Sequence, residues 1–249
     1  MKKWYCLQKK QLLFPYSQKY HQYTQIYSYK MNKKAFIFDL DGVLVDTAKY
    51  HFFAWKKLAN SLGIDFSVEQ NEQLKGVSRA GTFEKILEWG NMTLPEDEFT
   101  TLLAQKNEDY LSYINQLDGS HVLPGAREMV DYLTKNNYPI ALGSASKNSR
   151  RILERADLLS YFEVIVDGTY NLKGKPNPAI FLTGAAQLGV APENCIVFED
   201  SVAGVTAANT ANMFSIGIGE EHVLSHARHV FADLSQVSID FVQEIGVIN

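Results

Sequence analysis

Cysteine and long apolar runs are scarce in this chain of 249 residues. Its two cysteines, Cys6 and Cys195, lie far apart in the sequence, so neither a disulfide scaffold nor a cysteine-based zinc site is expected. No apolar run approaches the roughly 18 residues that suggest a transmembrane helix. These absences, with an ordinary 46% hydrophobic composition, favour a globular protein of the reducing cytoplasm that does not enter a membrane.

The first thirty residues lack glycine, arginine and acidic residues, but contain six lysines and six tyrosines. Their apolar residues keep neither a period of 2 nor one of 3.6, so no amphipathic element is predicted. They also lack the long apolar core and small-residue cleavage site of a secretory signal. We expect residues 1–30 to be an extension outside the fold, with Met31 as a candidate natural start. The alternative is a basic tail that contacts a membrane or a partner.

The net charge of −4 conceals a more acidic body. All basic residues of the extension are lysines, and their removal leaves 18 basic against 28 acidic residues in 31–249. A surface of this sign is a poor match for a phosphate backbone, so no nucleic-acid partner is expected. Nothing in the sequence marks an interface between copies, and a monomer is expected.

Short apolar runs rich in strand-forming residues alternate with helical patterns through most of the body. The expected strands are Ala35–Asp39, Pro139–Gly143, Glu163–Val166, Cys195–Glu199 and Phe214–Ile218. The helical patterns between them are Gly125–Asn136, Asn148–Ala156, Pro178–Leu188 and Val202–Thr210. This alternation predicts an α/β fold with a Rossmann-like parallel sheet and helices on both faces. Ligands of such sheets bind at the carboxyl ends of the strands.

Residues 47–116 break the alternation, because they show helical patterns and no convincing strand. The clearest expected helices are Ala48–Leu62, Phe83–Trp89 and Glu96–Ile114. We therefore expect a helical cap domain at 47–116, inserted into a catalytic core formed by 31–46 and 117–249. Gly42 and the Asp118–Gly119 pair flank the insertion as candidate hinges, and a lid over the strand ends would exclude water.

Two acidic pairs follow predicted strands, Asp39 with Asp41 and Glu199 with Asp200. An Asp-x-Asp pair alone is weak evidence, because acidic pairs are frequent in turns. Adjacent carboxylates at a buried strand end, however, need a cation or hydrogen bonds to be tolerated. Four carboxylates on one rim suit Mg²⁺, which prefers oxygen ligands.

Ser144 and Lys175 are the remaining candidates for chemistry. Ser144 follows a predicted strand and precedes a predicted helix, so its hydroxyl and nearby N–H groups could hold a phosphate. Ser146 could at the same time cap that helix. Lys175 precedes Pro176 just before another helix; a single lysine is most often solvated, but this one could reach the rim.

The Asp39–Asp41 pair, Ser144, Lys175 and the Glu199–Asp200 pair follow one another along the chain. In this order they resemble the four motifs of the haloacid dehalogenase-like hydrolase superfamily, and the resemblance covers residues 33–249. Within it, the chain is most similar to sugar-phosphate mutases, in stretches of both the core and the cap, and the cap stretch Asn71–Arg79 matters most because the cap carries substrate choice. The similar stretches are Phe38–Val43, Asp46–Ala48, Tyr50–His51, Ala54–Lys56, Asn71–Arg79, Ser144–Asn148, Lys175–Pro176 and Glu199–Ser201.

The resemblance implies a role for each core residue. Asp39 would be the nucleophile that becomes an aspartyl-phosphate, and Asp41 the general acid and base for the sugar hydroxyl. Ser144 and Lys175 would surround the transferring phosphoryl oxygens. Mg²⁺ would be bound by Asp39, the Asp41 carbonyl, Asp200 and Glu199.

The resemblance also implies which residues bind the substrate. Arg79 and Lys106 would hold the non-transferring phosphate, and His51 with Lys75 would couple cap closure to Asp41. The implied set is His51, Trp55, Leu74, Lys75, Gly76, Val77, Arg79, Lys106, Ser144, Ala145, Ser146 and Asn148. Two alternatives stay open, because His51 and Trp55 at helical spacing could simply pack in a core, and Lys106 could be a solvated surface lysine.

Three functions are compatible with these residues. The expected one is a mutase that converts beta-glucose 1-phosphate to glucose 6-phosphate through a 1,6-bisphosphate, because Lys75, Arg79 and Lys106 suit a second phosphate site. The first alternative is a Mg²⁺-dependent sugar-phosphate phosphatase, in which water attacks the aspartyl-phosphate. The other is a regulatory protein that binds sugar phosphates without catalysis.

Overall fold

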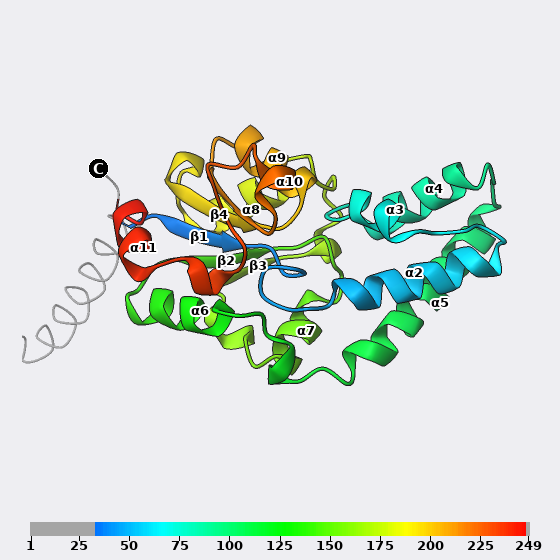
Figure 1. The fold of residues 1–249 in the computed structure, drawn as a ribbon, viewed down its shortest axis with the longest axis horizontal. Helices are drawn as coiled ribbons and strands as arrows, with labels where there is room; N and C mark the ends of the chain where they lie inside the picture. The colour runs from blue at the N-terminus through cyan, green and yellow to red at the C-terminus, as the bar shows by residue number, and fades with distance from the viewer. Residues whose placement is uncertain (1–32, 248–249) are drawn as a thin grey trace, which may run out of the picture.

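The computed structural model describes residues 33–247, so the expectations for residues 1–30 lie outside the described part. Its centre is a parallel sheet of order β3-β2-β1-β4-β5-β6 (Figure 1), which confirms the predicted fold class. The strands are β1 Ala35–Phe38, β2 Ile140–Gly143, β3 Val164–Val166, β4 Cys195–Glu199, β5 Phe214–Ile218 and β6 His229–Phe231. Only β6 is unpredicted, because three residues with an exposed histidine give no apolar run.

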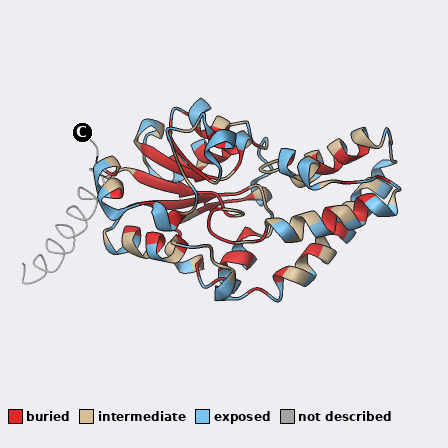
Figure 2. Ribbon diagram, viewed as in Figure 1, coloured by how far each residue is buried: buried red, intermediate tan, exposed pale blue. Residues whose placement is uncertain are grey.

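Helices cover both faces of the sheet because alternate side chains of each strand point to opposite faces. In β1, Phe36 and Phe38 pack in a cluster with helices α6 and α7, whereas Ala35 and Ile37 pack in a second cluster with α8 and α9. Both faces of β1 are buried, as Figure 2 shows. The helices are α6 Ala126–Lys135, α7 Ser149–Arg155, α8 Ala179–Leu188, α9 Val202–Thr210, α10 Glu221–Leu224 and α11 Ile239–Ile245.

Four helices form a separate group beyond the carboxyl ends of the strands (Figure 1). They are α2 Ala48–Ser61, α3 Val68–Gln73, α4 Arg79–Trp89 and α5 Glu96–Ile114. The group, hereafter the helical segment, has an apolar cluster of its own around Trp55, Phe66 and Phe83. The short α3 is unpredicted, although a reciprocal capping box between Ser67 and Gln70 begins it. The boundaries of a separate cap domain stay a prediction.

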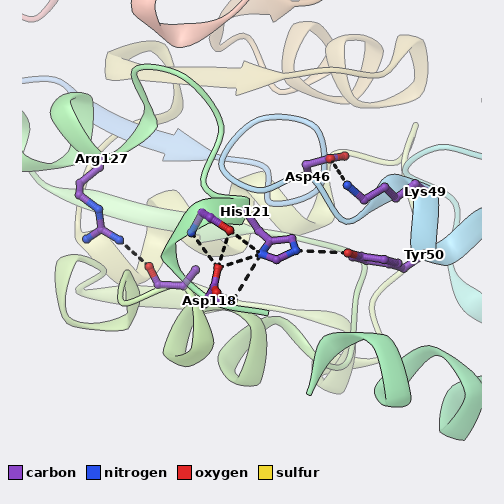
Figure 3. Close-up of polar contacts among 8 residues, drawn as sticks. Asp46, Lys49, Tyr50, Asp118, His121 and Arg127 are labelled. Atoms are coloured by element: carbon purple, nitrogen blue, oxygen red, sulfur yellow. Dashed lines mark hydrogen bonds and ion pairs between the residues drawn. The ribbon is translucent and has the colours of Figure 1, made fainter. Parts of the chain in front are cut away.

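Two linkers join the sheet to the helical segment and contact each other. Val45 in the first linker forms an antiparallel bridge with Val122 in the second. Figure 3 shows the His121 ring between Tyr50, whose hydroxyl lies 3.2 Å from Nε2, and Asp118, whose Oδ1 lies 3.2 Å from Nδ1. Both ends of the helical segment are therefore anchored at one place, where Asp118 was predicted as part of a hinge. No helix in 33–247 is long and apolar enough to cross a membrane.

Gly125 is expected to be far less tolerant of substitution than Gly189. Both have left-handed φ values, +76° and +70°, but a Cβ at Gly125 would lie 2.5 Å from Ser235 Cα, whereas nothing lies within 4 Å of one at Gly189. Gly189→Ala should cost about 1–2 kcal/mol of unfolding free energy from the backbone alone. Gly125→Ala should cost about 2–5 kcal/mol, because the clash adds to it. Urea denaturation measures both, and equal losses would contradict the prediction.

Candidate active site

The carboxyl ends of β1, β2 and β4 and the helical segment enclose a cavity of about 110 Å³. Asp39 directly follows β1, and its N–H still donates to the Phe198 carbonyl of β4 at 3.0 Å. This pairing brings the acidic residues after both strands to one edge, as predicted. The lining residues are Asp39, Asp41, Ala48, His51, Trp55, Asn71, Leu74, Lys75, Gly76, Val77, Arg79, Thr82, Lys106, Ser144, Ala145, Ser146, Lys147 and Asp200.

Lys175 lies behind the cavity, between two carboxylates. Its Nζ contacts Asp39 Oδ1 at 2.5 Å and also Glu199 Oε1, and its side chain is only 1% exposed. Burial alone would lower the pKa of Lys175, but the two carboxylates raise it above its ordinary value. Burial raises the pKa of Asp39 well above the usual range, with Lys175 opposing and the neighbouring carboxylates adding to the rise. Lys175 is therefore a fixed cation beside the proposed nucleophile rather than a solvated residue.

Asp41 faces the cavity and contacts two residues of the first linker and α2. The Thr47 hydroxyl donates to Asp41 Oδ1, and His51 Nε2 lies 3.9 Å from Oδ2. Burial raises the pKa of Asp41, although the Thr47 hydrogen bond works against this. A raised pKa favours a carboxyl group that can carry a proton, which is the property that a general acid requires.

Lys106, His51 and Trp55 form a cluster in the part of the cavity wall that α2 and α5 contribute. Lys106 is 2% exposed, and its Nζ lies 3.1 Å from His51 Nδ1 and 4.3 Å from the centre of the Trp55 ring. Burial and the charge of Arg79 lower the pKa of Lys106 to about 7. Burial, Lys106 and Arg79 also hold the pKa of His51 well below its usual value, so this ring is neutral at pH 7. The alternative of a solvated Lys106 is wrong.

The loop after β2 brings small polar groups to the cavity. The Ser144 hydroxyl is buried and accepts from the Ser146 N–H at 3.2 Å. The Ser146 hydroxyl accepts from the Asn148 N–H at 3.2 Å, so it holds the loop just before α7 rather than capping that helix. The Asn148 amide donates to Asn107 of α5 at 3.0 Å, which links this loop to the helical segment.

The structure also tests whether the acidic residues fit a cation. Asp200 lies directly against the Asp39–Gly42 turn, where a Cβ at Gly42 would be 2.7 Å from Asp200 Cγ. Burial and Glu199 raise the pKa of Asp200 to about 7, so the pair carries repulsion that a cation would relieve. Lys75 Nζ lies 3.3 Å from Asp200 Oδ2. Asp39, Asp41 and Asp200 therefore supply oxygen donors of the kind that a hard cation prefers, although their side chains do not converge as a formed metal site.

Glu199 is engaged differently from the other acidic residues. One of its oxygens contacts Lys175, and the other accepts from the N–H and hydroxyl of Ser201 at 2.8 and 2.9 Å. Across 33–247, no three His, Cys, Asp or Glu side chains converge as a ready metal site. The role of Glu199 as a metal ligand stays a prediction.

Most of the predicted binding residues line the cavity, and Asn148 is the exception. Trp55 lines the cavity and also stacks on Phe83. It therefore packs in the apolar cluster of the helical segment and at the same time lies where a substrate-binding residue is expected. Sequence reasoning missed Thr47 as the Asp41 partner and Tyr110, whose ring stacks on His51 with centroids 4.0 Å apart. Helical spacing could have indicated Tyr110, which follows Lys106 by one turn. The missed lining residues are Ala48, Asn71, Thr82 and Lys147.

Comparisons with known proteins give consistent relatives. The family model for haloacid dehalogenase-like hydrolase matches residues 33–212. The beta-phosphoglucomutase of Bacillus subtilis (strain 168) is 41% identical over 85% of this chain and 94% of its own. The phosphorylated carbohydrates phosphatase of Thermotoga maritima is 30% identical over 78% and 88%. The crystal structure of beta-phosphoglucomutase from Clostridium difficile superposes with a TM-score of 0.83 at 42% identity, over 85% of this chain and 96% of that one.

Replacing Lys175 should destabilise the protein more than replacing an exposed lysine that also forms a close ion pair. Lys175→Met leaves Asp39 and Glu199 buried without their cation and should cost about 3–5 kcal/mol of unfolding free energy. The control is Lys85→Met, because Lys85 pairs with Glu88 at 2.7 Å in solvent and should change stability by less than about 0.5 kcal/mol. Urea denaturation at pH 7 measures both, and similar values for the two variants would disprove the expectation.

Lys106 should make the protein more stable as the pH rises from about 7 to 10. In this window the unfolded chain binds the lysine proton but the folded protein does not, since burial lowers the folded pKa to about 7. Relative to Lys106→Met, the wild type should gain about 2–4 kcal/mol of unfolding free energy across the window. Lys57→Met, at an exposed ion pair, serves as the control. Parallel stability–pH curves for wild type and Lys106→Met would contradict a lowered pKa.

Proposed function

The chain belongs to the haloacid dehalogenase-like hydrolase family, and from this premise we propose that it is a phosphomutase. The reaction would interconvert beta-D-glucose 1-phosphate and glucose 6-phosphate through a 1,6-bisphosphate. The observation that carries this proposal is one cavity that is lined both by Asp39 and Asp41 of the core and by Arg79 and Lys106 of the helical segment. A bisphosphate needs such a second phosphate site, and the relatives named beta-phosphoglucomutase support the same reading.

The proposed chemistry is carried by Asp39 and Asp41. In one half-reaction an Asp39 oxygen attacks a phosphorus of the 1,6-bisphosphate, the bond from that phosphorus to the sugar oxygen breaks, and the oxygen takes the proton of Asp41, which leaves a glucose monophosphate and an aspartyl-phosphate. In the other half-reaction the free hydroxyl of a glucose monophosphate gives its proton to Asp41 and attacks the phosphoryl group on Asp39, which frees Asp39 and forms the bisphosphate again. The raised pKa of Asp41 favours this exchange, and Thr47 holds the carboxyl group in place.

Cationic groups would balance the charge of the transferring phosphoryl group. Lys175 is fixed beside Asp39, and Ser144 lines the same side of the cavity. Mg²⁺, when bound, would supply further charge neutralisation there. Asp39, the Asp41 carbonyl and Asp200 would hold it, with Glu199 as a further proposed ligand. The fixed positions of these groups are what phosphoryl transfer chiefly requires.

The helical segment, proposed as a cap domain over 47–116, would decide the fate of the phosphoryl group. Arg79 and Lys106 would hold the non-transferring phosphate, while Lys75, Gly76 and Val77 would contact the sugar. A closed cap excludes water and so favours transfer to sugar over hydrolysis. The phosphatase alternative is supported by the Thermotoga maritima relative. A binder without catalysis is disfavoured because Asp39, Asp41 and Lys175 are all present.

The deciding measurement is turnover of beta-glucose 1-phosphate with Mg²⁺ and a trace of glucose 1,6-bisphosphate. We expect glucose 6-phosphate to form with little free phosphate, because the cap protects the aspartyl-phosphate. Free phosphate as the main product would reassign the protein as a sugar-phosphate phosphatase. The Asp39→Asn variant should lose at least about a thousandfold in turnover, since the amide is no nucleophile. Unchanged turnover by Asp39→Asn would overturn the mechanism.

A further inference from the structure

Lys106 differs from Lys75 and Lys175, which also surround the cavity, because no acidic group pairs with it. Lys147 has no acidic partner either, but it is exposed and donates to Asn171 at 3.3 Å. Lys175 contacts Asp39 and Glu199, and Lys75 contacts Glu72 at 2.8 Å and Asp200 at 3.3 Å. Within the described chain, no Asp or Glu oxygen lies within 4.0 Å of the Lys106 amine. Its polar neighbour is instead the His51 ring, at 3.1 Å.

The surroundings of Lys106 favour an uncharged amine. On α2, His51 is neutral and Trp55 presents its ring face; on α5, the Tyr110 ring centre lies 5.0 Å from the amine. Burial and the positive Arg79 of α4 lower the pKa of Lys106 to about 7, opposed only in part by the more distant Asp41. The carboxylates beside Lys75 have the opposite effect and raise its pKa. At neutral pH a large share of Lys106 is therefore a free amine that faces a cavity.

We propose that Lys106 is a nucleophilic amine that captures phosphorylated aldehydes in this cavity as reversible imines. The amine nitrogen attacks the carbonyl carbon, and a proton moves to the oxygen to give a carbinolamine. Loss of water then leaves the imine, so no oxidant or reductant is needed. Arg79 lines the same cavity and would hold the phosphate group of the aldehyde.

This capture goes beyond the proposed mutase reaction and does not require turnover. A sugar phosphate in its closed ring form presents no free carbonyl, so the proposed substrate would pass Lys106 without reacting. An open-chain phosphorylated aldehyde would instead occupy the cavity covalently and compete with the sugar phosphate. Lys106 would thus make the enzyme sensitive to phosphorylated aldehydes as a class.

The test uses the full chain, with pyridoxal 5′-phosphate as the probe and borohydride to reduce the imine, followed by peptide mass mapping. At pH 7 we expect Lys106 to be labelled at least about tenfold faster than Lys75, because the carboxylates beside Lys75 keep that amine protonated. The labelling rate should reach half its maximum near pH 7. Pyridoxal, which lacks the phosphate, should react more slowly if Arg79 anchors the probe.

Matched variants keep this test decisive. Lys106→Arg preserves a cation and should lose the fast labelling, and Lys106→Met serves if the arginine does not fold. Lys57→Arg, at an exposed ion pair, should label as the wild type does. The inference would be overturned if the cavity lysines were labelled at equal rates, or if Lys106→Arg did not reduce the labelling rate. Turnover of beta-glucose 1-phosphate is measured separately on unlabelled protein. Labelling of Lys106 without turnover would reject the proposed mutase activity but not the imine. Turnover without labelling would reject the imine but not the mutase activity.

Discussion

A buried cation between two carboxylates is the interaction on which the active-site edge of the sheet depends. Lys175 joins Asp39, after β1, to Glu199, at the end of β4, in a place with almost no solvent. Two carboxylates at adjacent strand ends would otherwise repel each other without water to screen them. Ser201 completes the hydrogen bonds of Glu199. The position of the proposed nucleophile is therefore set by charge balance as much as by the sheet.

The acidic and the basic groups around the cavity have pKa values that are shifted by the same cause, their burial. Burial raises the pKa of the carboxyl groups Asp41 and Asp200 and lowers that of Lys106 and His51. Each shift favours the neutral form of its group. A sugar phosphate that enters the cavity would bring negative charge close to these groups. The basic groups Lys106 and His51 are then partly or fully neutral, and the acidic groups Asp41 and Asp200 partly retain their protons. Such a site can exchange protons with a hydroxyl at neutral pH, which fits the proposed roles.

The helical segment connects to the sheet through few but specific contacts. The two linkers pair at Val45 and Val122, and the Asn148 amide donates to Asn107 of α5. Lys75 reaches Asp200 from the same segment. These contacts hold the proposed substrate-binding residues and the proposed reacting residues around one cavity, although they come from different parts of the chain.

The sequence by itself determined the order of strands and helices, because the period of apolar residues depends only on local backbone geometry. It also located the acidic pairs, since the carboxyl ends of parallel strands share one edge. It did not reveal β6, α3, α10 or α11, which are too short to show a period. Tertiary structure alone decided that Lys106 is buried and unpaired, that Glu199 binds Lys175, and that Thr47 and Tyr110 join the site. These outcomes depend on which side chains meet across elements distant in the chain, and on the loss of solvent that follows when they do.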